Sequence, residues 1–267
     1  TSGHHGPTHG PIWPRERILI TDSLWGSGYQ VPGGEIETLR LAKPLGLSAA
    51  SSLLLVGAGS GGPACSLATQ LGVWVSGYDA DQALTHAALD RIAHHRLDKR
   101  VQAETWDPAR PDFPLHYYHH CLALEPLRGT KPEPTLAALA GAIKPGGQLM
   151  MTELVADTAL DPRDPTVRRW AELEHRDPSR LVPELGITRV LRRLGFDVRI
   201  AENISRRHMD QALLGWRMQV RAMEEIERPS ASQAALLVRE AELWLMRLRL
   251  FRSGRLHMVR WHALSRP

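Results

Sequence analysis

Short apolar runs alternate with amphipathic segments through most of the chain. The apolar runs have the length of buried strands, and apolar residues spaced three or four apart indicate helices. The pattern predicts seven strands, near residues 52–56, 73–78, 101–103, 115–122, 148–154, 195–200 and 256–264. It predicts helices near 35–41, 63–71, 81–97, 133–143, 166–175, 186–194, 208–227 and 232–251. Because strand and helix alternate up to about Leu154, we expect an α/β fold with a doubly wound, mostly parallel sheet.

Two segments depart from this alternation. Residues 156–185 carry three Asp-Pro pairs around a short helix, and we expect them to form a cap insertion over the carboxyl edge of the sheet, where ligands bind in such folds. Residues 1–17 begin with a stretch rich in Gly, Pro and His that has no apolar period, so we expect a flexible N-terminal tail. Residues 18–267 are then expected to form a single domain.

A glycine-rich turn follows the first strand of the predicted sheet. Leu53–Val56 lead directly into Gly57, Gly59 and Gly62, and glycines allow both a sharp turn and close approach of the backbone to a ligand. Asp79 ends the next strand about 20 residues later, at the spacing where a carboxylate can bind ribose hydroxyls. The pattern therefore predicts a site for an adenosine-containing cofactor. By itself it does not separate a dinucleotide from S-adenosylmethionine.

A second turn favours S-adenosylmethionine. Lys144-Pro145-Gly146-Gly147 stands between a predicted helix and an apolar strand, downstream of the glycine turn. The combination resembles the class I S-adenosylmethionine-dependent methyltransferases. The resemblance implies a Rossmann-like class I fold, a mostly parallel seven-stranded sheet with helices on both faces, here with a helical cap. It also implies S-adenosylmethionine as cofactor and S-adenosylhomocysteine as product.

The N-terminal half resembles a narrower group. Trp25-Gly26-Ser27-Gly28-Tyr29 and the glycines at 33 and 34 are similar to the lid of phosphoethanolamine and related small-molecule N-methyltransferases. The resemblance implies a lid over residues 22–41, with Tyr29 as a catalytic residue that closes over the sulfonium. Trp106 can stack on adenine, and His120 can reach the cofactor as a second catalytic candidate or be a core histidine. The expected cofactor contacts are Tyr29, Gly57, Ala58, Gly59, Asp79, Ala80, Trp106 and His120.

Three positions depart from the family pattern. Leu55 stands where the family has an acidic residue, Pro114 interrupts the approach to the fourth strand, and Pro126 lies where a histidine is expected. Three hypotheses therefore remain. The first is a methyltransferase that acts on a nitrogen or oxygen of a small or lipid-like acceptor. The second is a catalytically degenerate relative that serves as a structural or regulatory partner, and a dinucleotide oxidoreductase is a distant third.

Charge and composition limit the classes of binding partner that we expect. The net charge of +4 comes from arginine clusters, but the aromatic interleaving typical of nucleic-acid platforms is absent, so we expect no nucleic-acid partner. An anionic acceptor remains open, as does a homodimer or a hetero-complex. The arginines that can bind an acceptor anion are Arg176, Arg180, Arg206, Arg207 and Arg249.

The remaining features argue against a metal site, a disulfide and a membrane span. His4, His5 and His9 have no carboxylate or cysteine at a ligand-like spacing, so we predict no metal site. Cys65 and Cys121 are expected to be packed thiols. Because no apolar run reaches the roughly 18 residues of a membrane span and no signal peptide is recognisable, we expect a cytoplasmic location.

Overall fold

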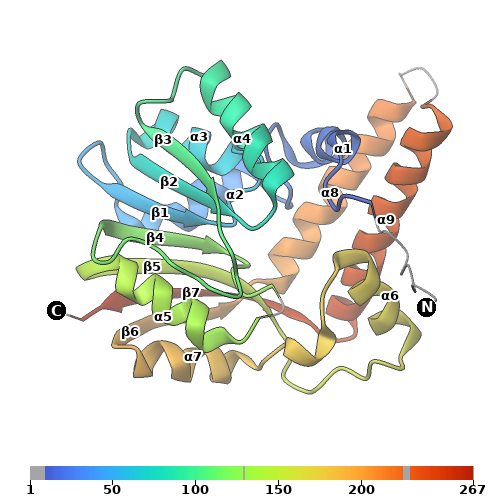
Figure 1. The fold of residues 1–267 in the computed structure, drawn as a ribbon. Coiled ribbons are helices and arrows are strands. Elements are labelled where there is room, and N and C mark those ends of the chain that lie inside the picture. The colour runs from blue at the N-terminus through green and yellow to red at the C-terminus, as the bar shows by residue number, and fades with distance from the viewer. Residues whose placement is uncertain (1–9, 129, 225–228, 267) are drawn as a thin grey trace, which may run out of the picture.

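The strands form a seven-stranded sheet in the order β3-β2-β1-β4-β5-β7-β6 (Figure 1). The computed structural model describes residues 10–128, 130–224 and 229–266. The strands are β1 (Ser52–Val56), β2 (Trp74–Asp79), β3 (Val101–Thr105), β4 (Tyr118–Leu124), β5 (Ile143–Val155), β6 (Phe196–Asn203) and β7 (His257–Ser265). β1 to β5 pair in parallel, whereas β7 runs antiparallel to both β5 and β6. The predicted mostly parallel sheet of seven strands is confirmed.

Helices cover both faces of this sheet. The helices are α1 (Arg15–Trp25), α2 (Gly34–Ala42), α3 (Gly62–Leu71), α4 (Gln82–His94), α5 (Pro132–Ala142), α6 (Pro165–Glu174), α7 (Glu184–Arg193), α8 (Ser205–Met223) and α9 (Ala231–Arg252), with short 3-10 turns η1 (Lys43–Leu45) and η2 (Pro178–Arg180). Leu139 of α5 and Leu191 of α7 belong to one buried cluster of the sheet. Leu41 of α2, Leu67 of α3 and Ile92 of α4 belong to the cluster on the other face. The arrangement is the expected doubly wound one.

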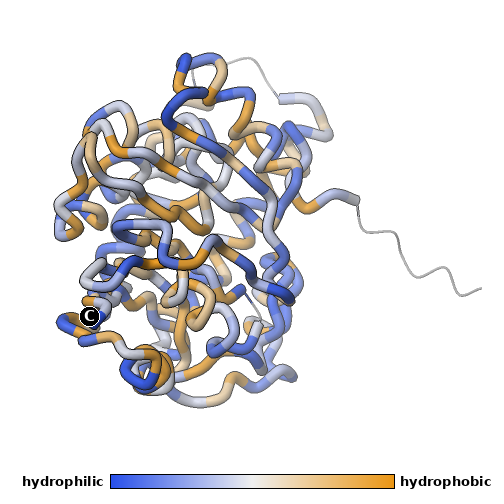
Figure 2. The backbone as a smooth tube through the Cα atoms, turned by 60° about the vertical axis from the view of Figure 1, so that its left-hand side comes forward, coloured by the Kyte–Doolittle hydropathy of each residue, from blue (hydrophilic) through white to orange (hydrophobic). Residues whose placement is uncertain are grey.

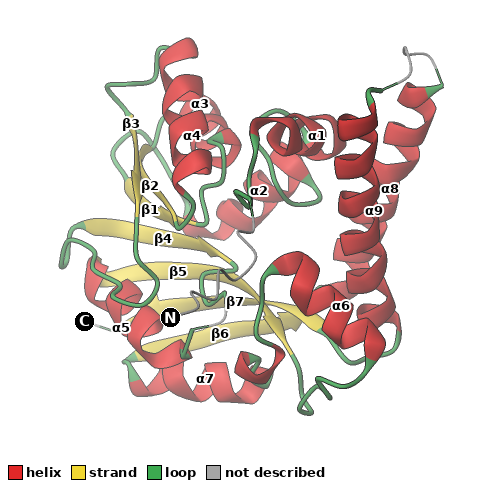
Figure 3. Ribbon diagram, turned by 45° about the vertical axis from the view of Figure 1, so that its right-hand side comes forward, coloured by secondary structure: helices red, strands yellow, loops and turns green. Residues whose placement is uncertain are grey.

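A helical cap with its own core lies beyond the carboxyl ends of the parallel strands (Figure 3). Trp25 of α1, Trp170 of α6, and Trp244 and Phe251 of α9 belong to one buried cluster, to which α8 adds Ala212. The predicted insertion 156–185 supplies only α6 and η2 of this cap. The cap is therefore larger than predicted, because apolar faces from both ends of the chain are buried against each other.

The N-terminal boundary differs from the prediction. α1 begins at Arg15, and Trp13 before it is only 6% exposed. Arg17 pairs with the buried Glu240 of α9 at 2.7 Å. The predicted tail 1–17 is thus too long, because Trp13 packs with Ile18 and with Leu84 of α4, and the ion pair holds Arg17 to the cap. Residues 1–9, which include the three tail histidines, lie outside the described residues.

The start of β4 also differs from the prediction. Leu115 is 75% exposed, and His116 has a left-handed φ of 47°, so the strand begins at Tyr118 rather than at residue 115. A residue in the left-handed region does not continue an extended strand. The result is a shorter strand whose carboxyl end falls at Leu124.

Apolar residues gather inside this framework. Figure 2 shows hydrophobic and hydrophilic stretches alternating along the trace. The apolar side chains gather in buried clusters on both faces of the sheet. Cys65 and Cys121 are both buried and free, as predicted. Within the described part of the chain, no helix combines the length and the apolar character required to cross a bilayer.

Candidate cofactor site and its buried charge network

Two adjoining hollows open at the carboxyl ends of β1, β2 and β4. Both are lined by Trp13, Gly57, Asp79, Glu125 and Arg128. The first extends under the lid toward α8, and the second extends past the end of β3. The location agrees with the rule that ligands of α/β sheets bind outside the carboxyl ends of the strands.

The glycine turn and Asp79 lie side by side in this site. The backbone N–H groups of Gly57 and Ala58 donate to Tyr78 O at 2.9 and 3.1 Å, so the turn is fixed to the end of β2. The Asp79 carboxylate accepts from Gly59 N at 2.8 Å and from Asp81 N at 3.0 Å. Burial raises the pKa of Asp79. Each carboxylate oxygen keeps a free lone pair, which a ribose hydroxyl can use.

The second hollow holds the other two residues predicted beside Asp79. Ala80 and Trp106 both line it. Trp106 is buried, and its ring lies 5.4 Å from that of Phe113. An apolar wall of this kind beyond a ribose-binding carboxylate suits a purine ring.

The predicted lid lies directly on the glycine turn. Tyr29 is buried and lines the first hollow, and its hydroxyl donates to Ser66 Oγ at 2.6 Å. Gln30 donates to Ser60 Oγ and accepts from Ser60 N, both at 2.8 Å. Burial raises the pKa of Tyr29 to about 12, so its phenol is neutral at physiological pH. The lid residue can pack and shape the cavity, but its high pKa disfavours a role as general base.

His120 lies at the wrong end of its strand for the predicted role. It is the third residue of β4, it pairs with Leu53 near the start of β1, and it lines neither hollow. Its Nδ1 atom accepts from Gln148 N at 3.1 Å. The prediction of His120 as a cofactor or catalytic residue is therefore wrong, because the parallel strand carries its amino-terminal half to the edge opposite the site. Glu125, just beyond the carboxyl end of β4, takes the place beside the cavity.

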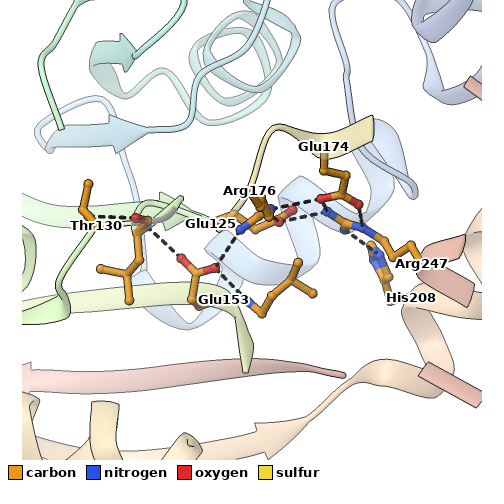
Figure 4. Close-up of polar contacts among 9 residues, drawn as sticks. Glu125, Thr130, Glu153, Glu174, Arg176, His208 and Arg247 are labelled. Atoms are coloured by element: carbon orange, nitrogen blue, oxygen red, sulfur yellow. Dashed lines mark hydrogen bonds and ion pairs between the residues drawn. The ribbon is translucent and has the colours of Figure 1, made fainter. Parts of the chain in front are cut away.

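A buried charge network, which the sequence analysis did not find, forms the floor between the site and the cap (Figure 4). Glu125 accepts from Arg176 and, at 3.1 Å, from Arg247 of α9. Arg247 also forms a two-point pair with Glu174 at 2.6 and 2.9 Å. Arg176 Nε donates to Glu174 at 3.0 Å. All four side chains are nearly inaccessible, so the two carboxylates and two guanidiniums compensate each other.

The three carboxyl groups of the network differ widely in pKa. Burial opposes ionisation of Glu125, but Arg247 and Arg176 prevail and hold its pKa well below the ordinary range. The same guanidiniums overcome burial at Glu174 and lower its pKa to about 2. Glu153 on β5 lies 3.9 Å from Arg176, and burial raises its pKa to about 7. The floor thus offers two ionised carboxylates and one that is partly protonated near neutral pH.

His208, at the start of α8, connects the network to the cavity. It is buried and lines the first hollow, and its Nε2 atom lies 3.2 Å from Arg247 Nη1. A guanidinium can only donate, so Nε2 is the acceptor and Nδ1 carries the ring proton. Burial, and then Arg247, lower the pKa of His208 to about 3. No sequence signal marked this residue, since α8 places it here only through tertiary packing.

Comparison with known proteins identifies the scaffold. No protein-family model matches the chain. Phosphoethanolamine N-methyltransferase 2 of Caenorhabditis elegans is 28% identical over 131 residues, 48% of this chain and 30% of that protein. Methyltransferase GfsG of Streptomyces halstedii is 28% identical over 154 residues, 54% of this chain and 55% of that protein. The chain thus matches about half or less of the length of these curated relatives.

A solved structure extends the likeness to nearly the whole chain. Phosphoethanolamine N-methyltransferase 2 of Haemonchus contortus, in complex with S-adenosyl-L-methionine, has a TM-score of 0.80 over 94% of this chain and 57% of that chain, at 20% identity. The chain has the class I methyltransferase fold. The assignment of the fold rests on the sheet order, in which β7 is inserted antiparallel between β5 and β6.

Most of the arginines proposed for an acceptor anion already have partners in the structure. Arg176 belongs to the buried network, Arg207 pairs with Glu37 at 2.9 Å, and Arg180 lies 3.6 Å from Asp177. The side chains of Arg206 and Arg249 have no hydrogen bond or ion pair within the described residues. Of these two, only Arg206 lines a hollow, an open groove between α2 and α8.

The lining of the cavity suits alignment of two reactants better than proton abstraction. Its deeper part is lined by Glu125, Thr152, His208, Gln211 and Met258. The titratable groups among these five residues are a strongly acidic carboxyl, Glu125, and a histidine of low basicity, His208. Transfer of an already activated methyl group needs proximity, orientation and exclusion of water rather than a protein nucleophile.

Proposed function

We propose that the protein is an S-adenosylmethionine-dependent methyltransferase that transfers a methyl group to a nitrogen or oxygen of a small-molecule or lipid-like acceptor. The observation that carries the proposal is the Asp79 carboxylate bound to Gly59 N–H at the edge of the cavity. Its position suits the two hydroxyls of a ribose. The methyltransferase relatives and the S-adenosyl-L-methionine bound in a structural neighbour support it.

The proposed chemistry is an in-line displacement. S-adenosylmethionine would supply a methyl group activated by a sulfonium, with S-adenosylhomocysteine left as product. The residues of this chain would then have three tasks. Asp79 and Trp106 orient the nucleoside, Tyr29 and Gln30 hold the lid against the glycine turn, and the deeper wall around Thr152 and His208 positions the acceptor.

Calorimetric titration tests the cofactor. We expect S-adenosylmethionine and S-adenosylhomocysteine to bind the wild type and binding to be lost in Asp79→Ala, because a buried hydrogen-bonding partner of the ribose is removed. Asp161→Ala is the matched control, since Asp161 lies on the exposed surface of the cap. Equal affinity of the wild type and Asp79→Ala would reject the assignment of Asp79. A folded protein that binds neither ligand would reject the enzyme and favour the degenerate structural relative, while binding of NAD alone would favour an oxidoreductase.

Transfer itself needs a direct assay. Methyl-labelled S-adenosylmethionine is incubated with amines, phosphobases and hydroxylated lipids, and we expect label in at least one acceptor class. Asp79→Ala, which should not bind the cofactor, serves as the background. Tight cofactor binding without transfer to any acceptor would favour the degenerate alternative.

A further inference from the structure

The cofactor site lacks the carboxylate that the family resemblance places on the first strand. Leu55 occupies that position, is 0% exposed and belongs to a buried apolar cluster. The cofactor of the proposed function ends in an α-amino acid group with one ammonium and one carboxylate. A charged group taken from water without a partner is costly, so each needs a counter-charge in the site.

Glu125 has one unpaired carboxylate oxygen. Both of its hydrogen bonds, from Arg176 and Arg247, end on Oε1. Oε2 has no hydrogen-bond partner within the described residues. Fully enclosed side-chain atoms without a hydrogen-bond partner occur, among the described residues, in Trp25, Thr135, Trp170 and Trp216. Oε2 of Glu125 is not one of them, so it is not fully enclosed. Glu125 itself lines both hollows.

Arg128 presents the opposite charge three residues later. Its side chain is exposed, and its guanidinium has no hydrogen bond or ion pair within the described part of the chain. It lines both hollows together with Glu125, and its positive charge favours the ionised forms of both Asp79 and Glu125. Its backbone φ of 22° is unusual for a residue other than glycine and bends the chain sharply beyond β4.

The pairing of β1 with β4 brings these two residues to the glycine turn. Val56 pairs with Ala123, so Gly57 lies beside Leu124, the residue before Glu125. The contact is close enough that a Cβ atom on Gly57 would lie 2.2 Å from Leu124 O. A ligand that touches the turn therefore lies next to the Glu125 carboxylate.

We propose that Glu125 and Arg128 bind the α-amino acid end of the cofactor, with Glu125 taking the ammonium and Arg128 the carboxylate. The pair does from β4 what the missing acid at position 55 would do from β1. This inference rests on the proposed function, since it needs an adenosyl amino acid as ligand. Arg176 and Arg247 hold the Glu125 carboxylate in place from behind and leave Oε2 for the ligand.

Three adenosine ligands separate the two contacts by calorimetric titration. S-adenosylhomocysteine has both the ammonium and the carboxylate, decarboxylated S-adenosylmethionine has only the ammonium, and 5′-methylthioadenosine has neither. Arg128→Gln is expected to weaken S-adenosylhomocysteine by about 10- to 100-fold, the loss of one charge-assisted contact, and to leave the other two ligands unchanged. Glu125→Gln is expected to weaken the two ligands with an ammonium and to leave 5′-methylthioadenosine unchanged.

Two controls keep the result interpretable. Arg168→Gln removes an exposed arginine of α6 that lines neither hollow and should change none of the three affinities. Glu125→Gln disturbs a buried network, so the folding of this variant is checked by circular dichroism. If Glu125→Gln unfolds, the test is decided by Arg128→Gln, which changes an exposed side chain. Equal losses for all three ligands, or no loss for S-adenosylhomocysteine in Arg128→Gln, would overturn the pair. A wild type that binds none of the three would instead reject the proposed function.

Discussion

At the scale of single residues, His208 shows how one contact fixes a protonation state. Arg247 donates to Nε2, and burial lowers the pKa of His208 to about 3. We therefore predict that the ring stays neutral from pH 8 down to about pH 4.5, with the proton on Nδ1. Nitrogen-detected NMR checks this, with His208→Gln assigning the signal. A titration midpoint near the ordinary histidine value of about 6.5 would contradict it.

The same shift has a consequence for stability. In the unfolded chain His208 takes up a proton near its ordinary pKa, whereas in the folded protein it does so only near the lowered value of about 3. The unfolded state thus binds more protons over this interval, and the contribution of His208 to the free energy of unfolding falls as pH decreases from about 6.5 toward 3.

Tyr29 gives a second prediction at this scale. Its hydroxyl is bound to Ser66 and its pKa is about 12, so the ring matters more for packing under the lid than for proton transfer. Tyr29→Phe is expected to lower affinity for S-adenosylmethionine by less than about tenfold, the value of one neutral hydrogen bond, whereas Tyr29→Ala should lose much more. Calorimetry measures both. Loss of binding in Tyr29→Phe would show that the hydroxyl itself contacts the cofactor.

At the scale of elements, the lid and α3 interlock through glycine. Gly62 N donates to Gly28 O at 3.0 Å, and a Cβ on Gly62 would lie 2.7 Å from both the Gly28 carbonyl carbon and the Tyr29 ring. Gly62→Ala should therefore push the lid away and cost about 1–3 kcal/mol of folding free energy, as overpacking does, together with cofactor affinity. Denaturant unfolding and calorimetry measure the two losses.

Gly186→Ala is the control for this substitution. Gly186 lies in α7 with no atom closer than 3.8 Å to an added Cβ, so alanine there should stabilise the protein by up to about 1 kcal/mol through helix propensity. If both variants behave alike, the lid does not depend on close approach at Gly62.

At the scale of the whole molecule, the buried charge network joins the sheet to the cap. Glu125 and Glu153 come from the sheet and Glu174, Arg176, His208 and Arg247 from the cap. Removing one charge from such a network leaves another uncompensated. Glu174→Gln should therefore lower the free energy of unfolding by about 3–5 kcal/mol at pH 7. Glu172→Gln, an exposed neighbour, should change it by less than about 0.5 kcal/mol.

The effect of Glu174 should depend on pH in a defined direction. Its pKa falls from an ordinary 4.5 to about 2 on folding, so the stability it adds is complete above about pH 4.5 and is lost as pH falls toward 2. The difference between the wild type and Glu174→Gln should then shrink from pH 7 to pH 3 in chemical denaturation. A difference that is the same at both pH values would mean that Glu174 acts through packing rather than charge.

The amino-acid sequence alone determined the features that depend on neighbours along the chain. Apolar runs and helical spacing predicted the seven strands, and the glycine turn with Asp79 pointed to the candidate cofactor cavity, because a turn and the next strand end are fixed by local geometry. The tertiary structure decided the rest. α1 and the enlarged cap required burial against helices from the other end of the chain, and His120 was misplaced because β4 begins three residues later than its pattern suggests and its start lies at the opposite edge of the sheet. Glu125, Arg176, His208 and Arg247 meet only through packing of distant elements, since a buried charge finds its partner by proximity in space, which no spacing along the chain records.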